Sequence, residues 1–326
     1  MPAFLSRARF ITLGVAVVAS AFLPAFAQSP AKVSFRLDWK AGGQHAPFFL
    51  GKERGFFAAE GIDLNIISGS GSSDSVKQLG ANAVDMALVD GLVLVQAAEQ
   101  QVPVKSIAAY YQRTPIVLLS PKAKPITSPQ QLTSGVKVGS KRASATYQGL
   151  VALLAANQID LKKVNLVDIG FGVQPLLVGQ VDALMGFTMN ESIEAESAGM
   201  PVNEMLLADH GVTAYGLVLA TNDKFLAAKP ELVRGFMRAT RRAVEAAVAD
   251  KQAAVQSLTK AASEMDAPRE LKVLTKTLPV WSVKATDLSG FGTQTAQGWQ
   301  QTVDTAKRVG LIETPPPVKS LFAAGF

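Results

Sequence analysis

The order of apolar and polar positions near residue 33 predicts a strand, a turn and a helix. Apolar residues at 33–37 alternate with polar ones, which is the two-residue period of a β-strand. The pair Gly42-Gly43 breaks this period, and residues 46–57 then show helical spacing. A second strand is predicted at 62–67. The turn after the first strand should therefore lie beyond the carboxyl end of a sheet, where open α/β sheets bind ligands.

Strand and helix patterns alternate along most of the chain. Further apolar segments predict strands at 86–89, 104–109, 116–120, 136–139, 164–169, 183–187 and 215–221. Helical spacing recurs at 75–81, 92–100, 146–157, 230–250, 251–264, 268–278 and 292–309. This alternation is typical of an α/β protein.

A weak internal repeat suggests two similar α/β units. Ile62-Asp63-Leu64 is echoed by Ile159-Asp160-Leu161, and Val84-Asp85 by Val181-Asp182. The two motifs start 22 residues apart in each copy, at 62 and 84 and at 159 and 181. Chance similarity of two strand–loop–helix units is the alternative. Two copies are too few for a solenoid, so the repeat favours two lobes.

The expected domain boundaries follow from two apolar segments that flank the second copy, residues 116–120 and 215–221. If both cross between lobes, residues 122–212 form lobe 2, inserted into a lobe 1 made of 28–121 and 213–326. Two strands that join two lobes make a hinge around an interlobe cleft. The predicted fold is therefore α/β, with two lobes and two crossover strands that form the hinge.

The first 27 residues have the pattern of a secretory signal peptide. Arg7 and Arg9 precede an apolar run at 10–23, and Ala-Phe-Ala at 25–27 is a cleavage signal. No later run approaches the roughly 20 apolar residues of a membrane span. Because the chain has no cysteine, a lipid anchor and disulfides are not expected. We expect a monomeric protein of the bacterial periplasm.

Charge and histidine content narrow the classes of partner. The net charge is +6, but the basic residues are scattered and form no arginine-rich stripe with interleaved aromatics, which argues against nucleic acid. His45 and His210 are the only histidines, and neither lies in a cluster with metal-ligand spacing. We therefore expect neither a metal nor a cofactor, and the mild positive charge leaves a small anionic ligand possible.

Several motifs resemble those of a known family. In chain order they are Asp38-Trp39, His45 six residues after that tryptophan, RGFFAAEGIDL at 54–64, Asn82–Leu88, Ser144–Thr146 and Gly179–Leu184. With them the chain resembles the periplasmic substrate-binding proteins of importers for sulfonates, nitrate and thiamine pyrimidine precursors, a group related to thiamine-pyrimidine synthase. The resemblance covers nearly the whole mature chain. It implies a type II-like binding protein, with two α/β lobes that close on a ligand and an ATP-driven (ABC) permease in the inner membrane as partner.

Within that group, Asp38-Trp39 with His45, and Asn190-Glu191, resemble the pyrimidine-binding branch. Where that branch usually has an asparagine- or proline-rich turn, this chain has Lys-Ala-Gly-Gly at 40–43. The resemblance therefore indicates the family and does not single out one ligand.

Trp39 and His45 are the first candidate ligand residues. Trp39 offers a flat face to a heteroaromatic ring, and packing in the core is its alternative role. His45 either donates a hydrogen bond to a ring nitrogen or hydroxyl, or caps the helix that follows.

A serine-glycine loop and an aspartate complete the candidates of lobe 1. Loop 68–74 precedes a helix, so the backbone N–H groups at Ser72 and Ser73 are placed for a polar or anionic group. Its alternative is a plain loop in which Ser73 or Asp74 caps the helix. Asp90 ends an apolar strand, either as a ligand acceptor or as the cap of the next helix.

Lobe 2 and the hinge supply five more candidates. Ser144 and Thr146 form the matching helix start. Glu191 would accept a bidentate pair from an aminopyrimidine beside Asn190, or would simply complement a helix dipole as a first-turn acid. Tyr215 lies at the second crossover, where it either closes over the ligand or is an ordinary hinge residue.

These observations predict a periplasmic solute-binding protein with a pyrimidine-type ligand or a similar heteroaromatic. A sulfonate- or nitrate-type anion is the alternative ligand. An enzyme like the related synthase ranks lower, because the resemblance implies a cysteine-rich iron-binding segment there and this chain has no cysteine. A sensor domain, read by a histidine kinase instead of a permease, is a third class.

Overall fold

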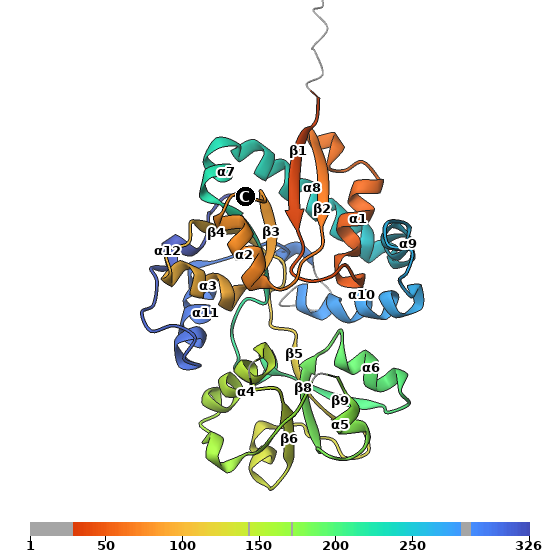
Figure 1. Cartoon of the computed structure of the whole chain (residues 1–326), viewed down its shortest axis with the longest axis vertical. Coiled ribbons are helices and arrows are strands. Elements are labelled where there is room, and N and C mark those ends of the chain that lie inside the picture. The colour runs from red at the N-terminus through yellow and green to blue at the C-terminus, as the bar shows by residue number, and fades with distance from the viewer. Residues whose placement is uncertain (1–28, 143, 171, 282–287) are drawn as a thin grey trace, which may run out of the picture.

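The computed structural model describes residues 29–142, 144–170, 172–281 and 288–326, and it shows two five-stranded sheets in separate lobes (Figure 1). The predicted signal peptide at 1–27 lies outside the described residues. In lobe 1 the strand order is β2-β1-β3-β10-β4, with β1 (Ala31–Arg36), β2 (Ile62–Ile67), β3 (Met86–Asp90), β4 (Val104–Ala109) and β10 (Leu217–Asn222). In lobe 2 it is β7-β6-β8-β5-β9, with β5 (Ile116–Pro121), β6 (Lys137–Ser140), β7 (Asn165–Asp168), β8 (Ala183–Phe187) and β9 (Val202–Leu206).

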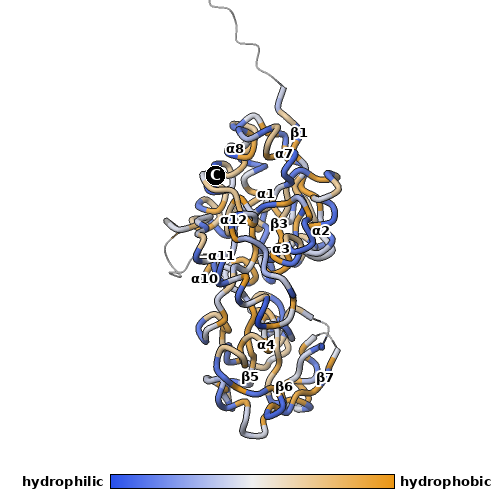
Figure 2. Tube along the Cα trace, turned by 90° about the vertical axis from the view of Figure 1, so that its left-hand side faces the viewer, coloured by the Kyte–Doolittle hydropathy of each residue, from blue (hydrophilic) through white to orange (hydrophobic). Residues whose placement is uncertain are grey.

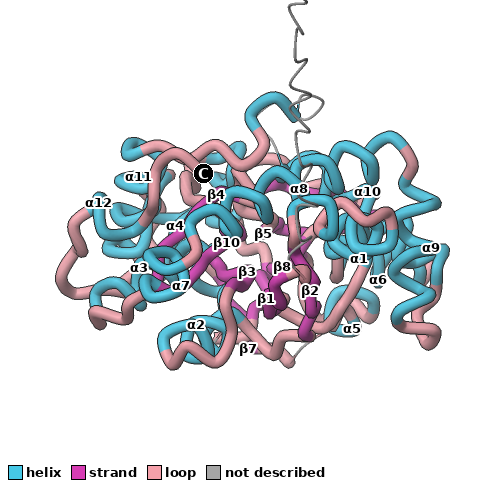
Figure 3. Tube along the Cα trace, turned by 90° about the horizontal axis from the view of Figure 1, so that it is seen from above, coloured by secondary structure: helices cyan, strands magenta, loops and turns pink. Residues whose placement is uncertain are grey.

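Most of the described helices belong to lobe 1. They are α1 (Ala46–Glu53), α2 (Ser72–Gly80), α3 (Gly91–Glu99), α7 (Asp223–Ala228), α8 (Pro230–Ala249), α9 (Lys251–Ala261), α10 (Ala267–Trp281), α11 (Ala296–Arg308) and α12 (Val318–Leu321). Those of lobe 2 are α4 (Ala145–Ala156), α5 (Gln174–Leu177) and α6 (Glu191–Ser197). Seen from above, helices lie on both sides of the lobe 1 strands (Figure 3). Among the described residues, no helix combines the length and apolar character needed to cross a membrane.

The two sheets follow one plan. In lobe 1, β1 runs parallel to β2 and β3, and β10 runs antiparallel to β3 and β4. In lobe 2, β6 runs parallel to β7 and β8, and β5 runs antiparallel to β8 and β9. Each sheet therefore has one antiparallel strand in the same place, which confirms the two-lobed α/β fold expected from the sequence.

The Val-Asp motif of the repeat has the same structural role in both lobes. Asp85 precedes β3 and accepts a hydrogen bond from the backbone N–H of Ser34 in β1 (2.8 Å). Asp182 precedes β8 and accepts one from the backbone N–H of Lys137 in β6 (2.9 Å). Each carboxylate thus ties two neighbouring parallel strands together, β3 to β1 in lobe 1 and β8 to β6 in lobe 2. The Ile-Asp-Leu motif is not equivalent, because residues 62–64 lie in β2 whereas residues 159–161 precede β7.

Strand pairing moves the expected boundary between the lobes. Residues 116–121 were expected in lobe 1, but they form β5, which pairs with β8 and β9 in lobe 2. The chain therefore changes lobe at 110–115 and returns at 211–216, and these two segments lead directly into β5 and β10. The spacing of apolar residues shows that 116–120 is a strand, but it does not show which sheet the strand joins.

The two crossing segments lie side by side. The backbone N–H of Tyr111 donates to the Leu217 carbonyl (2.7 Å), and the N–H of Gly216 donates to the Tyr111 carbonyl (3.0 Å). A β-carbon at position 216 would lie 2.7 Å from the Arg113 carbonyl oxygen, so this close approach requires glycine. The two lobes remain one above the other in a view turned by 90° (Figure 2).

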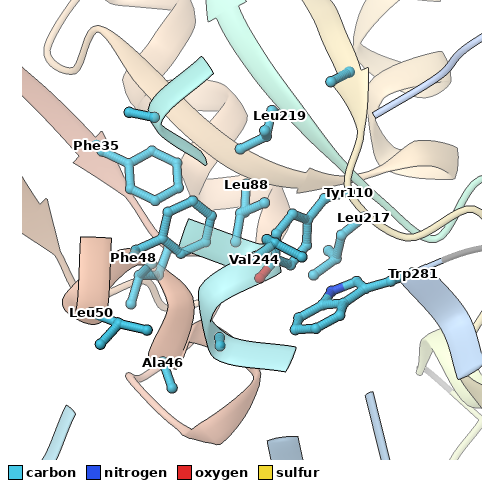
Figure 4. Packing of buried hydrophobic residues seen from close by; sticks show 14 of the residues in the cluster. Phe35, Ala46, Phe48, Leu50, Leu88, Tyr110, Leu217, Leu219, Val244 and Trp281 are labelled. Carbon is cyan, nitrogen blue, oxygen red and sulfur yellow. The ribbon is translucent and has the colours of Figure 1, made fainter. Parts of the chain in front are cut away.

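Aromatic side chains fill the core of lobe 1 beneath α1 and α8. Phe48 of α1 packs against Phe35 of β1, with ring centroids 4.6 Å apart, and against Tyr110, at 5.4 Å (Figure 4). Trp281 completes this cluster and has no exposed surface. Trp299 and Phe291 are also buried.

Candidate functional site

The carboxyl ends of the parallel strands in both sheets face the crossing segments. In lobe 1, β4 leads into the crossing, and β1 and β3 run parallel to β4 because β10 is antiparallel to both β3 and β4. In lobe 2, β5 leaves the crossing and β8 runs back toward it, so that the Thr188 N–H donates to the Pro115 carbonyl (3.1 Å). The loops after β1, β3, β6 and β8 therefore lie where the lobes meet (Figure 1).

Trp39 is exposed at the end of β1. Its side chain is 53% exposed, whereas Trp281 and Trp299 have no exposed surface, so the alternative of a core tryptophan is wrong. The loop is fixed by the Gly69 N–H, which donates to the Trp39 carbonyl (2.9 Å). A β-carbon at Gly71 would lie 4.0 Å from Cζ3 of the indole, so the ring lies beside the start of α2.

His45 is paired with Asp38 inside lobe 1. Its Nε2 lies 2.8 Å from Oδ1 of Asp38, and the imidazole has no exposed surface. It occupies the N-cap position of α1 but makes no side-chain cap hydrogen bond, so the capping alternative is wrong. The ring holds the Asp38 carboxylate, which is 19% exposed. Asp38 was not among the candidates, although its place directly before Trp39 at a strand end pointed to it.

The serine loop is built differently from the prediction. Helix α2 begins at Ser72, three residues before the expected start, and its N-cap is Gly71, with φ of 125° and no side-chain cap hydrogen bond. Neither Ser73 nor Asp74 is therefore the cap. The Ser72 hydroxyl accepts a hydrogen bond from the Asp90 N–H (2.9 Å), and Ser73 is exposed. Ser72 thus joins α2 to the end of β3.

Asp90 caps α3. Its Oδ1 accepts hydrogen bonds from the backbone N–H groups of Leu92 (2.9 Å) and Val93 (3.3 Å), as the capping alternative predicts. Burial, together with the charge of nearby Asp38, raises the pKa of Asp90 to about 6, although these two hydrogen bonds lower it. The structure thus brings Trp39, Ser72 and Asp90 together around Asp38, with His45 behind it.

Ser144 and Thr146 come together at the start of α4, which begins at Ala145. The Ser144 hydroxyl donates to the Lys141 carbonyl (2.6 Å), lies 2.8 Å from the Thr146 hydroxyl and accepts from the Tyr147 N–H (3.2 Å). Ser144 is therefore the N-cap, and its hydroxyl bonds to the preceding loop and to the first turn of α4. Thr146 is 9% exposed.

Glu191 begins α6 and folds back onto the end of β8. Its Oε2 accepts a hydrogen bond from the Phe187 N–H (2.8 Å). Burial raises the pKa of Glu191, backbone hydrogen bonds from Phe187 and Glu191 itself oppose this, and the charge of Glu194 adds to the rise. Asn190 is exposed and makes no side-chain cap hydrogen bond. Asp90 is the last residue of β3 and Glu191 lies four residues after β8, and each carboxylate accepts a backbone hydrogen bond close to the end of its strand.

Tyr215 packs inside lobe 1, where its backbone lies against Gly91, the residue after Asp90, and its side chain contacts the start of α11. It is 7% exposed, its hydroxyl accepts a hydrogen bond from the Thr295 N–H (2.9 Å), and its ring meets Trp299 edge to face at 5.2 Å. The prediction that Tyr215 closes over a ligand is therefore corrected. Its hydroxyl is engaged at the start of α11, and the residue belongs to the hinge.

Two surface hollows of lobe 1 contain none of the candidates. One of about 250 Å³ is lined by Arg241, residues 292–294 and the last residues of the chain. The other, of about 490 Å³, lies between the end of α3 and residues 314–317. The described residues also hold no group of three or more His, Asp or Glu side chains arranged for a metal ion. The candidate site is thus defined by the residues at the strand ends.

Three relatives cover most of this chain. The riboflavin-binding protein RibY of Chloroflexus aurantiacus is 27% identical over 304 residues, which are 90% of this chain and 86% of that protein. The formylaminopyrimidine-binding protein of Halalkalibacterium halodurans is 25% identical and covers 90% of this chain and 89% of its own. The 4-amino-5-hydroxymethyl-2-methylpyrimidine phosphate synthase of Aspergillus parasiticus is 26% identical, with coverage of 86% and 84%.

Solved structures show the same fold at lower identity. The periplasmic aliphatic sulphonate binding protein SsuA from Escherichia coli superposes with a TM-score of 0.73 at 13% identity, over 91% of this chain and 94% of that one. The periplasmic nitrate-binding protein NrtA from Synechocystis PCC 6803 gives 0.61 at 12% identity, over 86% and 85%. The chain has the two-lobed periplasmic binding protein fold. The NMT1/THI5-like family model matches residues 43–254, and the chain therefore belongs to that family.

Proposed function

We propose that this protein is the solute-binding component of an ABC importer and captures a small ligand between its lobes. The observation that carries the proposal is the exposed indole of Trp39, held at the end of β1 beside the Asp38–His45 pair. This ring lies at a strand end where the two lobes meet, and its exposed face is a surface on which a small ligand can bind. The binding-protein relatives support the same function.

The proposed ligand is a pyrimidine-type thiamine precursor or a similar flat heteroaromatic. Stacking on Trp39 contributes about 0.5–1.5 kcal/mol beyond the area buried. Asp38 and Glu191 are acceptors for the N–H groups of an aminopyrimidine, one from each lobe. A ligand bound by groups of both lobes favours the closed arrangement by its differential affinity for that state.

A small anion of the sulfonate or nitrate type is the second candidate. The N-terminus of α4, with Ser144 and Thr146, supports it because helix N-termini attract anions. Three carboxylates at the strand ends oppose it, those of Asp38, Asp90 and Glu191. The Ser144 hydroxyl is also already hydrogen bonded to the preceding loop and to the first turn of α4. The heteroaromatic ligand therefore remains the first choice.

Binding is favoured over catalysis, although pyrimidine synthases are among the relatives. The His45 ring is fully buried and hydrogen bonded to Asp38, so it is not exposed for chemistry on a substrate. The leader-like residues 1–27 support export to the periplasm, where an inner-membrane permease would receive the ligand. We propose a monomer that acts by opening and closing.

Thermal unfolding of residues 28–326 with a small ligand library tests this proposal. The library contains hydroxymethyl- and formylaminopyrimidines, riboflavin, alkylsulfonates and nitrate. A ligand at 100 times its Kd stabilises the folded state by about 2.7 kcal/mol and raises the melting temperature. A shift with a pyrimidine or flavin that disappears in Trp39→Ala and is retained in Trp39→Phe would support the proposed site.

Tryptophan fluorescence gives an independent readout of the same binding. Because Trp281 and Trp299 are fully buried, a ligand that stacks on the exposed ring should quench mainly Trp39. A shift with sulfonate or nitrate alone, unchanged in Trp39→Ala, would contradict the heteroaromatic proposal and favour the anion.

A further inference from the structure

A buried carboxylate of α10 holds the loop that carries Trp39 and His45. Glu270, in the first turn of α10, is 4% exposed. Its Oε2 accepts a hydrogen bond from the backbone N–H of Gly43 (2.5 Å), and its Oε1 accepts one from Arg269 (2.6 Å). The acceptor comes from a residue 227 positions later in the chain, so the contact is a tertiary one.

The loop approaches α10 so closely that only glycine fits. A β-carbon at position 43 would lie 2.1 Å from the Glu270 carbonyl oxygen and 2.9 Å from the Leu274 nitrogen. Gly43 is the last residue of the Lys-Ala-Gly-Gly turn at 40–43. The turn and the carboxylate therefore form one matched junction.

This junction lies between the proposed ligand-facing residues and the histidine that holds one of them. Trp39 and Asp38 precede it in the chain, and His45, which is paired with Asp38, follows it by two residues. The Tyr110 hydroxyl is another anchor of the loop to the core, because it donates to the Gln44 carbonyl (2.9 Å). Without the Glu270 carboxylate, the Gly43 N–H would be buried without its acceptor, and a buried unpaired N–H destabilises that conformation.

Helix α10 also contacts lobe 2 and the crossing. Lys276 pairs with Glu204 of β9 and with Glu196 of α6 (3.3 Å). Burial disfavours its charge, but the hydrogen bond and charge of Glu204 outweigh this and raise the pKa of Lys276. The Val280 carbonyl accepts from the Gln112 N–H of the first crossing segment (2.8 Å). One helix therefore reaches the loop, the hinge and the second lobe.

We propose that Glu270 is a positioning residue for ligand binding, because its carboxylate fixes the Gly42–Gly43 turn and with it the place of Trp39 and Asp38. The role in binding rests on the proposed function, whereas the ordering of the loop does not. A loop that is already ordered loses less conformational entropy when the ligand binds, so the affinity is higher.

Two measurements without ligand test the ordering of the loop. In Glu270→Ala, hydrogen exchange of the peptide covering residues 38–45 should become faster than in the unsubstituted protein. Acrylamide should also quench Trp39 more strongly, measured as the difference from the same variant in a Trp39→Phe background. Glu270→Gln keeps an acceptor oxygen, so its exchange rate at 38–45 and its Trp39 quenching should lie between those of Glu270→Ala and the unsubstituted protein. This intermediate result separates a local role from general destabilisation.

Two control variants match these changes. Glu264→Gln removes an exposed carboxylate just before α10. Lys276→Met breaks the contact with lobe 2 and leaves Glu270 in place. Both should leave exchange at 38–45 and quenching of Trp39 unchanged. Equal exchange and quenching in Glu270→Ala and the unsubstituted protein would overturn the proposal.

Affinity measurements then test the role in binding. For a heteroaromatic ligand found in the thermal screen, Glu270→Ala should weaken binding by about tenfold, equivalent to one hydrogen bond to a charged group. A looser loop with unchanged affinity would overturn the positioning role. If the library yields no ligand, exchange and quenching still decide whether Glu270 orders the loop, so failure of the proposed function is distinguishable from failure of this inference.

Discussion

The two lobes share one strand plan but support their ligand-facing ends differently. In lobe 1 the loop after β1 is held by the Asp38–His45 pair, by Tyr110 and by Glu270 of a helix from the other end of the chain. In lobe 2 two anchors of the loop before α4 come from within that lobe: the Ser144 hydroxyl donates to the Lys141 carbonyl, and the Arg142 N–H donates to the Asp168 carboxylate at the end of β7 (3.1 Å). The common sheet plan decides where ligand groups can lie, and the added helices of lobe 1 decide how firmly they are held.

The ends of β3 and β8 show most clearly how the two lobes resemble each other. Asp90 after β3 and Glu191 after β8 both accept hydrogen bonds from nearby backbone N–H groups, and burial raises both pKa values. The further supports differ: at the lobe 1 end the Ser72 hydroxyl accepts from the Asp90 N–H, and at the lobe 2 end the Thr188 N–H donates to the Pro115 carbonyl of the crossing. The three predictions that follow test this combination of a shared plan and unequal support.

The largest effect is expected at the junction of lobe 1 with α10. Gly43→Ala should lower the free energy of unfolding by about 3 kcal/mol, because its β-carbon would lie 2.1 Å from the Glu270 carbonyl oxygen. Gly170→Ala in lobe 2 is the matched change, since nothing lies within 4 Å of a β-carbon there. Urea denaturation of both variants measures the contrast, and equal losses would contradict the unequal support.

A pH-dependent effect of both strand-end carboxylates is expected next. The pKa of Asp90 is raised from 3.8 to about 6, so the folded protein keeps a proton that the unfolded chain releases between these values. The stability that Asp90 contributes is complete below pH 3.8 and is lost as the pH rises through about 6. Relative to Asp90→Asn, the unsubstituted protein should lose about 2–3 kcal/mol between pH 4 and pH 7.

Urea denaturation at several pH values checks this sign in both lobes. Asp90→Asn keeps an oxygen for the cap and cannot ionise. Glu191→Gln should show the same direction, because the pKa of Glu191 is also raised. Stability curves that stay parallel between each variant and the unsubstituted protein would show that these carboxylates are not shifted.

The smallest difference is expected between the repeated aspartates. Asp85 is half-buried and accepts from both the N–H (2.8 Å) and the hydroxyl (2.7 Å) of Ser34, whereas Asp182 is exposed and accepts from the Lys137 N–H (2.9 Å). Asp85→Ala should cost about 2 kcal/mol of unfolding free energy and Asp182→Ala less than about 1 kcal/mol. Denaturant midpoints measure both losses. A larger loss of unfolding free energy in Asp182→Ala than in Asp85→Ala would contradict the expected order of the two aspartates.

Local patterns predicted what depends on neighbours in the sequence. The strand at 86–89 is β3 with one more residue, and the Val-Asp repeat marks equivalent positions in both sheets. The place of Trp39 beyond a strand end was also readable, because a glycine turn follows the strand directly.

Long-range contacts explain what local patterns missed. The sheet that β5 joins depends on pairing with β8, more than 60 residues away. The burial of Tyr215 depends on the start of α11, 80 positions later. Neither partner has a signature in the residues beside β5 or Tyr215. The start of α2 was missed for a local reason, because its cap is Gly71, with φ of 125° and no side-chain hydrogen bond, and not a polar side chain.

The place of β10 has a consequence for the order in which the lobes can be completed. This strand lies between β3 and β4, so the sheet of lobe 1 stays divided until residues 217–222 are available. All five strands of lobe 2 lie within residues 116–206, a continuous segment made earlier. A chain that emerges from its amino end can therefore finish the inserted lobe first, and the lobe that carries Trp39 closes its sheet only afterwards.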